Sequence, residues 1–260
     1  MIPPRNLFRV FACAASLLVL AGCSTVTFAR KPPPEIPPAV LLDRVREHAG
    51  RLETFEARGM FTAVSGEGAF RGSIQVAARP PDSIWIKIEG PLGIDLLTAR
   101  MAGGQIAYYS PWMKNSAPDS ADLPNFSGFL PAGLDSLTAL TGLFGLPMPK
   151  NGMSDSLRSV SIERSRTLLR VGADESIWIE SRGPVISRWE KRGSDGSLVW
   201  AYEAGQFKSS GGLRIPKKIR FVRNEDSEVV LYYEQIHANK PLKRGWCDVR
   251  IPKGAENRTL

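Results

Sequence analysis

The spacing of apolar residues divides the chain into one amphipathic helix and two long runs of predicted strands. Between residues 39 and 53, apolar positions recur at helical spacing with charged positions on the opposite face, which predicts a helix. From Phe55 the period falls to two, and each alternating run ends at a cluster of Gly, Pro, Ser, Asn or Asp. The clearest run places Ile84, Ile86 and Ile88 on one face of a strand, so that face is expected to be covered.

The connections between the alternating segments are short, so neighbouring strands are expected to pair antiparallel. We predict strands at residues 58–64, 69–78, 83–89, 94–101, 105–109, 159–163, 167–173, 176–180, 185–191, 198–207, 214–222, 228–238 and 245–251. Ten to thirteen strands cannot remain a flat open sheet, so the fold class is mainly β, with a strongly curved sheet or a partly closed barrel. Periodicity does not decide whether both halves join one sheet.

The middle of the chain interrupts this pattern. Residues 111–131 form an irregular, polar stretch, after which Leu134, Leu137, Leu140 and Phe144 return to helical spacing. The predicted helix is apolar on more than one side. It has more apolar surface than the edge of a sheet could cover. It either fills the inner face of the sheet or lines a cavity together with the three isoleucines, and the sequence leaves both readings open.

The N-terminus has the pattern of an export signal. Two arginines without a nearby acid precede an apolar run of eleven residues, 10–20, which is short for a membrane span. The tetrapeptide Leu20-Ala-Gly-Cys23 resembles the lipobox of bacterial lipoproteins. That resemblance implies cleavage after residue 22 and attachment of diacylglycerol and an acyl chain to Cys23. The alternative is an ordinary signal with an incidental cysteine. Ser24 is compatible with export to the outer membrane.

Three parts follow: a signal peptide at 1–22, a lipidated tether at 23–38 and a folded domain at 39–260. The tether contains Lys31-Pro-Pro-Pro-Glu-Ile-Pro-Pro38 and is expected to be extended, with a reach of roughly 45 Å. The chain carries a net charge of +8, or +6 without Arg5 and Arg9. A basic exported protein is attracted to anionic lipid, whereas export argues against nucleic acid as a partner.

Catalytic and metal-binding patterns are missing from the sequence. It contains two histidines, His48 and His237, which are far apart, and none of the common hydrolase, metalloprotease or phosphate-loop motifs. Of three cysteines, Cys13 leaves with the signal and Cys23 is expected to be lipidated, so Cys247 cannot form an internal disulfide. We expect Cys247 to be a buried strand residue, and we expect no enzyme, metal or cofactor.

Several segments in order along the chain resemble the LolA/LolB lipoprotein superfamily. They are a strand beginning Phe55-Glu-Ala-Arg-Gly59, the turn Gly90-Pro-Leu-Gly93, Arg214-Ile-Pro-Lys-Lys-Ile219, Tyr232-Tyr233, Asn239-Lys-Pro-Leu242 and Ile251-Pro-Lys-Gly254. The resemblance covers nearly all of residues 39–254. It implies an unclosed barrel of eleven antiparallel strands, with helices forming a lid over an apolar cavity.

The resemblance also implies a function without catalysis. The protein would be a receptor in the bacterial outer membrane that faces the periplasm, binds acyl chains of lipoproteins or other lipids, and receives them from a periplasmic LolA-like chaperone. Cavity-lining candidates are Ile84, Ile86, Ile88, Leu134, Leu137, Leu140 and Phe144. The alternative is an accessory lipoprotein whose packed domain is a platform for protein interactions.

The turn Pro91-Leu92-Gly93 is the second candidate site. Turn tips are normally polar, so Leu92 is unusual there. Leu92 either folds back onto its own sheet or, as the resemblance implies, protrudes and enters the acceptor bilayer.

Overall fold

The computed structural model describes residues 37–66, 68–81, 83–102, 105–109, 141–150, 152–163, 165–223, 227–247 and 257–259. Residues 36–260 form one compact unit. In the described residues, thirteen strands form a single sheet in the order β13-β5-β4-β3-β2-β1-β12-β11-β10-β9-β8-β7-β6. The order ends in two different strands, so the sheet is open rather than closed into a barrel.

The helix and strands have the following bounds, together with two short 3-10 turns, η1 (Pro91–Gly93) and η3 (Met153–Ser156). The helix is α2 (Pro38–Gly50), and the strands before residue 110 are β1 (Phe55–Ser65), β2 (Gly68–Arg79), β3 (Ser83–Glu89), β4 (Asp95–Ala102) and β5 (Gln105–Tyr109). The later strands are β6 (Leu157–Glu163), β7 (Arg166–Val171), β8 (Glu175–Glu180), β9 (Ile186–Arg192), β10 (Leu198–Ser210), β11 (Leu213–Arg223), β12 (Ser227–Ala238) and β13 (Asn257–Thr259).

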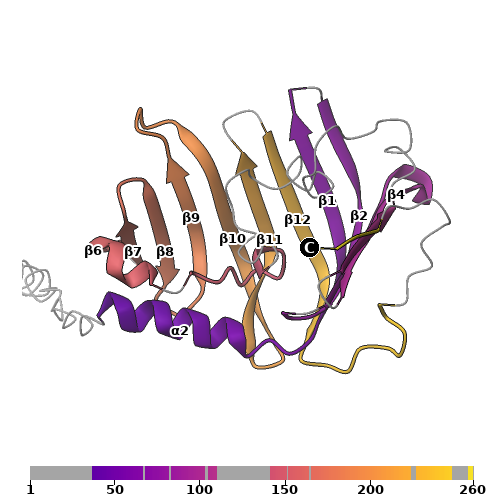
Figure 1. Ribbon diagram of the computed structural model, residues 1–260, viewed down its shortest axis with the longest axis horizontal. Coiled ribbons are helices and arrows are strands. Elements are labelled where there is room, and N and C mark those ends of the chain that lie inside the picture. The colour runs from indigo at the N-terminus through magenta and orange to yellow at the C-terminus, as the bar shows by residue number, and fades with distance from the viewer. Residues whose placement is uncertain are drawn as a thin grey trace, which may run out of the picture. The chain divides into compact units, whose positions relative to one another are not determined.

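Pairing of β1 with β12 joins the two halves of the chain into one sheet. Phe55 lies opposite Ala238, and Val64 lies opposite Glu228, in an antiparallel ladder that runs the length of both strands. The other neighbouring strands are also antiparallel, for example β2 with β3 and β10 with β11. The predicted fold class, a mainly β protein with one curved and unclosed antiparallel sheet, is therefore confirmed (Figure 1).

Helix α2 covers the inner face of the sheet at one end. Its buried residues Leu42, Val45 and Ala49 recur at helical spacing, and they belong to the same hydrophobic core as the inward residues of the strands. The helix lies across the end of the sheet where β10 turns into β11 (Figure 1). It is three residues shorter at its C-terminus than the predicted helix, because the chain turns at Arg51 toward β1. Among the described residues, no helix is long and apolar enough to cross a membrane.

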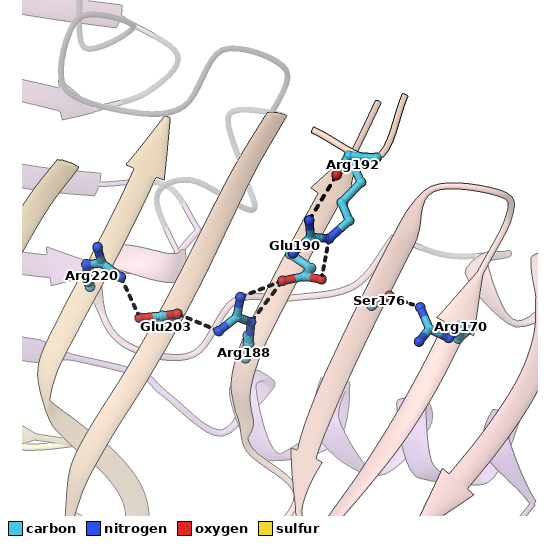
Figure 2. A network of polar contacts seen from close by, with 8 residues as sticks. Arg170, Ser176, Arg188, Glu190, Arg192, Glu203 and Arg220 are labelled. Atoms are coloured by element: carbon cyan, nitrogen blue, oxygen red, sulfur yellow. Dashed lines mark hydrogen bonds and ion pairs between the residues drawn. The ribbon is translucent and has the colours of Figure 1, made fainter. Parts of the chain in front are cut away.

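Burial alternates along the strands as predicted for a sheet with one covered face. In β3, Ile84, Ile86 and Ile88 are buried, and the residues between them are half-buried. Figure 2 shows the outer face of β8 to β11, where Arg188, Glu203 and Arg220 lie side by side on three neighbouring strands. Each arginine lies within 3.1 Å of a Glu203 carboxylate oxygen, so this carboxylate bridges the two arginines.

The predicted strand at 245–251 is wrong where it is described. Residues 244–247 form a turn in which the Trp246 amide donates to the carbonyl of Lys243 at 3.1 Å. Cys247 is half-buried in this turn rather than buried on a strand. The last strand, β13, lies further along the chain and pairs with β5. The sequence does not predict β13, because its three residues are all polar and show no alternation of apolar and polar positions.

Candidate functional site

An apolar cavity of about 270 Å³ lies between helix α2, the β2–β3 turn and the segment after residue 140. Its volume is near the lower limit of small-molecule sites, which range from about 300 to 1,000 Å³. The lining is almost wholly apolar, with hydroxyls from Ser83 and Thr141, and consists of Ala49, Gly50, Leu52, Pro80, Pro81, Ser83, Ile84, Met101, Thr141, Phe144, Leu146 and Met148. Gly50 and Pro81 are exposed, so the cavity opens at the α2 end of the sheet.

The segment 141–148 forms one wall, and its turn is fixed by hydrogen bonds at the end of a helix. Residues 141–143 are helical, the Gly145 amide donates to the Gly142 carbonyl at 2.9 Å, and the Leu146 amide donates to the Thr141 carbonyl at 3.0 Å. This pair of bonds is a Schellman motif, with Gly145 at the left-handed position (φ 75°). A Cβ at Gly145 would overlap the ring of Pro216, so glycine is required.

Two long-range contacts hold this wall against the rest of the domain. The Tyr233 hydroxyl donates to the Leu143 carbonyl at 2.9 Å, and Phe55 packs on Phe144 with ring centroids 5.1 Å apart. From helix α2, Arg46 donates to the carbonyls of Pro149 and Lys150 at 3.0 and 2.6 Å. The walls are therefore positioned by contacts outside the cavity and leave its interior apolar.

Asn239 fixes the end of helix α2. Its side-chain oxygen accepts from the Glu53 amide at 2.8 Å, and its side-chain nitrogen donates to the carbonyls of Arg51 and Gly211 at 3.0 and 3.2 Å. The residue has a φ of 55°, a conformation that asparagine adopts more readily than most residues. One side chain thus joins the α2–β1 connection, the β10–β11 turn and the end of β12. The sequence marked this residue as part of a motif but did not predict its contacts.

His48 is the one described histidine that is buried, at 8% exposure, on the face of α2 toward β11. Its Nε2 lies 3.5 Å from the carbonyl oxygen of Arg214. Burial lowers the pKa of His48, the contact with that carbonyl opposes the shift, and the charges of Arg51 and Arg214 lower it further. A neutral imidazole at this position is a structural part of the helix contact.

The predicted lining residues divide into three groups. Ile84 and Phe144 line the cavity. Ile86 and Ile88 are buried in the hydrophobic core and are not among the lining residues of this cavity. Leu134, Leu137 and Leu140 lie outside the described residues. The turn and helix-end residues Gly50, Pro80 and Pro81 were not predicted, because no periodic signal marks residues in such connections.

Leu92 does not fold back onto its sheet, because its side chain is 99% exposed. The turn Pro91–Gly93 holds Leu92 at φ 62°, a left-handed conformation that is unfavourable for leucine. At its base, Lys87 pairs with Glu89 and Asp95 at 2.7 and 2.9 Å. These ion pairs stabilise the base of the turn, and Leu92 exposes its apolar side chain to solvent at the tip.

Of the residues predicted for anchoring, 1–38, residues 1–36 with Cys23 lie outside the described residues, so the signal, lipid attachment and tether stay predictions. Pro38, the predicted end of the tether, is the first residue of helix α2. Within the part of the chain that the structure describes, no group of three His, Cys, Asp or Glu side chains could hold a metal ion.

Comparisons with known proteins agree with this architecture. No family model matches the chain, and no curated protein is similar to it in sequence. A solved structure of a DUF1329 family protein from Desulfovibrio piger is similar with a TM-score of 0.53 at 10% identity, over 82% of this chain and 97% of that chain. A LolA superfamily protein from Nitrosomonas europaea is similar with a TM-score of 0.51 at 13% identity, over 82% of this chain and 98% of that chain.

The open sheet, the crossing helix and these similarities define the class of fold. The chain has a LolA/LolB-like fold, in agreement with the resemblance seen in its sequence. The sheet has thirteen described strands rather than the eleven that the resemblance implied.

Proposed function

We propose that this protein is a lipid-anchored, non-catalytic carrier or receptor for acyl chains in the bacterial cell envelope. The observation that carries the proposal is the apolar cavity of about 270 Å³, which opens to solvent beside Gly50 and Pro81. Each methylene buried there contributes about 0.8 kcal/mol, so an acyl chain can be bound without a cofactor or nucleotide.

The proposal extends to location and partners. Cys23 carries the lipid anchor in the outer membrane, the folded domain faces the periplasm, and the cargo is an acyl chain of a lipoprotein or another lipid, delivered by a LolA-like chaperone. The exposed Leu92 contacts the acceptor bilayer during release. Burial of one leucine side chain contributes about 1.5–3 kcal/mol, which is too little to anchor the domain but enough to favour one orientation.

Binding of a fluorescent fatty-acid analogue to residues 36–260 tests the carrier function. Met148→Trp would fill part of the cavity and should weaken binding, because Met148 lines it and is only half-buried. Met60→Trp is the matched control, since Met60 is 44% exposed on β1 and is not among the lining residues. A folded protein that takes up no probe would contradict the carrier function and favour the interaction platform.

A further inference from the structure

In the described part of the domain, charged side chains form ion pairs in some regions and lack them in another. On the outer face and at the Leu92 end, several cations are paired with carboxylates: Lys87 with Glu89 and Asp95, Lys191 with Asp174, and Arg220 with Glu203 and Glu228. Figure 2 shows the continuation of this pairing through Arg188, Glu190 and Arg192. The charges of these paired side chains offset one another.

The opposite end of the sheet carries cations that are not paired in this way. It consists of the connections next to α2, where β1, β3, β9 and β11 begin and β2, β8, β10 and β12 end. We call it the cationic end, and its residues are Arg51, Arg79, Arg182, Lys208, Arg214, Lys240, Lys243 and Arg244. Among the described residues, none of these eight forms an ion pair with a carboxylate.

Acidic residues are few at the cationic end. Glu53 lies in the described connections, and Glu56 and Glu180 lie at the adjoining strand ends, where they pair with Arg58 and Arg166. Asp82 lies outside the described residues. Two of the cations are held by backbone carbonyls instead: Arg51 donates to the carbonyl of Gly212 at 3.3 Å, and Arg214 donates to the carbonyl of Arg182 at 2.8 Å. Their charges are thus held in place without being neutralised.

Apolar side chains accompany these charges. Leu242 and Trp246 are half-buried in the same loop as the exposed Lys243 and Arg244. Basic residues interleaved with leucine and tryptophan are typical of surfaces that lie at the boundary between lipid headgroups and acyl chains. The cations are also spread over five connections, which suits an extended anionic surface better than a single small anion.

We propose that the cationic end is a docking surface for a bilayer containing anionic phospholipid. Charge complementarity identifies the occupant, and the predicted anchor at Cys23 with its tether of roughly 45 Å keeps a bilayer within reach. The cavity opens at this same end, beside Gly50 and Pro81, so docking places its mouth at the headgroups. This inference rests on the proposed carrier function and specifies where the carrier meets the membrane.

Leu92 lies at the other end of β3, a strand of seven residues. At about 3.3 Å per residue, roughly 20 Å separates the two ends of this strand. When the strands stand perpendicular to a bilayer docked at the cationic end, Leu92 therefore lies roughly 20 Å from that surface. In this orientation the two sites contact a bilayer one after the other, the first through charge and the second through an apolar side chain.

Co-sedimentation of residues 36–260 with lipid vesicles tests the docking surface. Residues 36–260 contain the whole described core, so this part can be studied alone. We expect binding to vesicles of phosphatidylcholine with phosphatidylglycerol, weaker binding as salt increases, and little binding to phosphatidylcholine alone. The triple variant Lys240→Glu, Lys243→Glu, Arg244→Glu should bind at least about tenfold more weakly.

A control variant separates the possible outcomes. Arg71→Glu reverses an exposed cation on β2 away from the cationic end and should retain vesicle binding. Equal binding to the two kinds of vesicle, equal loss of binding in Arg71→Glu and in the triple variant, or equally strong binding of a duplex oligonucleotide would overturn the proposal. The fluorescent fatty-acid analogue, measured on the same variants, reports separately on the carrier function.

Discussion

Tyr233 and Tyr202 lie on neighbouring parts of the same core, but among the described residues only the hydroxyl of Tyr233 has a hydrogen-bond partner. Both rings are fully buried, and burial raises the pKa of each phenol well above its ordinary value. Tyr233 donates to the Leu143 carbonyl at 2.9 Å, whereas the buried Tyr202 hydroxyl has no hydrogen-bond partner in the described part of the chain. The first hydroxyl positions the cavity wall, and the second is a buried polar group that costs stability.

Removing the two hydroxyls should therefore have different effects. Tyr233→Phe leaves the Leu143 carbonyl without its partner and should lower the free energy of unfolding by about 1–3 kcal/mol. Tyr202→Phe should be neutral or stabilising. Urea denaturation of both variants measures the difference. Equal destabilisation would show that the Tyr202 hydroxyl has a partner in solution.

Asn239→Ala removes four side-chain hydrogen bonds, with Glu53, Thr54, Arg51 and Gly211, and places alanine at a positive φ. We expect a loss of about 1–3 kcal/mol in the free energy of unfolding and weaker probe binding, because the end of α2 forms part of the cavity. Asn239→Gly is the control, since glycine accepts the backbone conformation but not the hydrogen bonds. If the glycine variant were as stable as the wild type, the hydrogen bonds would contribute nothing.

Protonation of His48 should weaken the domain in acid. Its pKa is lower in the folded state than the ordinary value of 6.5, so the unfolded chain binds more protons between the two values. This contribution to stability is complete above about pH 6.5 and is lost as the pH falls toward the lower, folded-state pKa. The urea midpoint should fall as the pH is lowered across this range. The dependence of the midpoint on pH should become weaker in His48→Gln but persist in His237→Gln. If the urea midpoint of His48→Gln depended on pH as strongly as that of the wild type, the loss of stability in acid would come from other groups.

Leu92→Glu should leave the fold intact, because the side chain is 99% exposed. A surface change of this kind typically alters stability by less than about 0.5 kcal/mol. Cargo uptake should remain near normal, while release into outer-membrane vesicles should decrease. A large fall in melting temperature would instead show that Leu92 packs against the domain.

Cys23→Ala tests the anchor. The variant should not incorporate a radioactive fatty acid, and it should accumulate as a soluble periplasmic protein or as an uncleaved precursor at the inner membrane. Label retained by the variant would refute lipid attachment at this residue.

The fold was predictable because burial and turns leave strong local signals. Alternation in β3 identified its covered face, and Gly and Pro marked most strand ends. The pairing of β1 with β12 joins residues far apart along the chain, which periodicity cannot detect. The cavity was only partly predictable for the same reason. Ile84 and Phe144 belong to periodic apolar patterns, whereas Gly50 and Pro81 lie in connections and line the cavity because of the course of the backbone in the folded domain.

The pairing of β13 with β5 has a consequence for solubility. A strand at the edge of a sheet exposes unpaired amides and carbonyls, which can recruit a strand of another molecule. Residues 257–259 occupy that position along β5, with Asn257 opposite Ala107 and Thr259 opposite Gln105. Strand β13 thus pairs with part of this edge and hinders the pairing of β5 with a strand of another molecule.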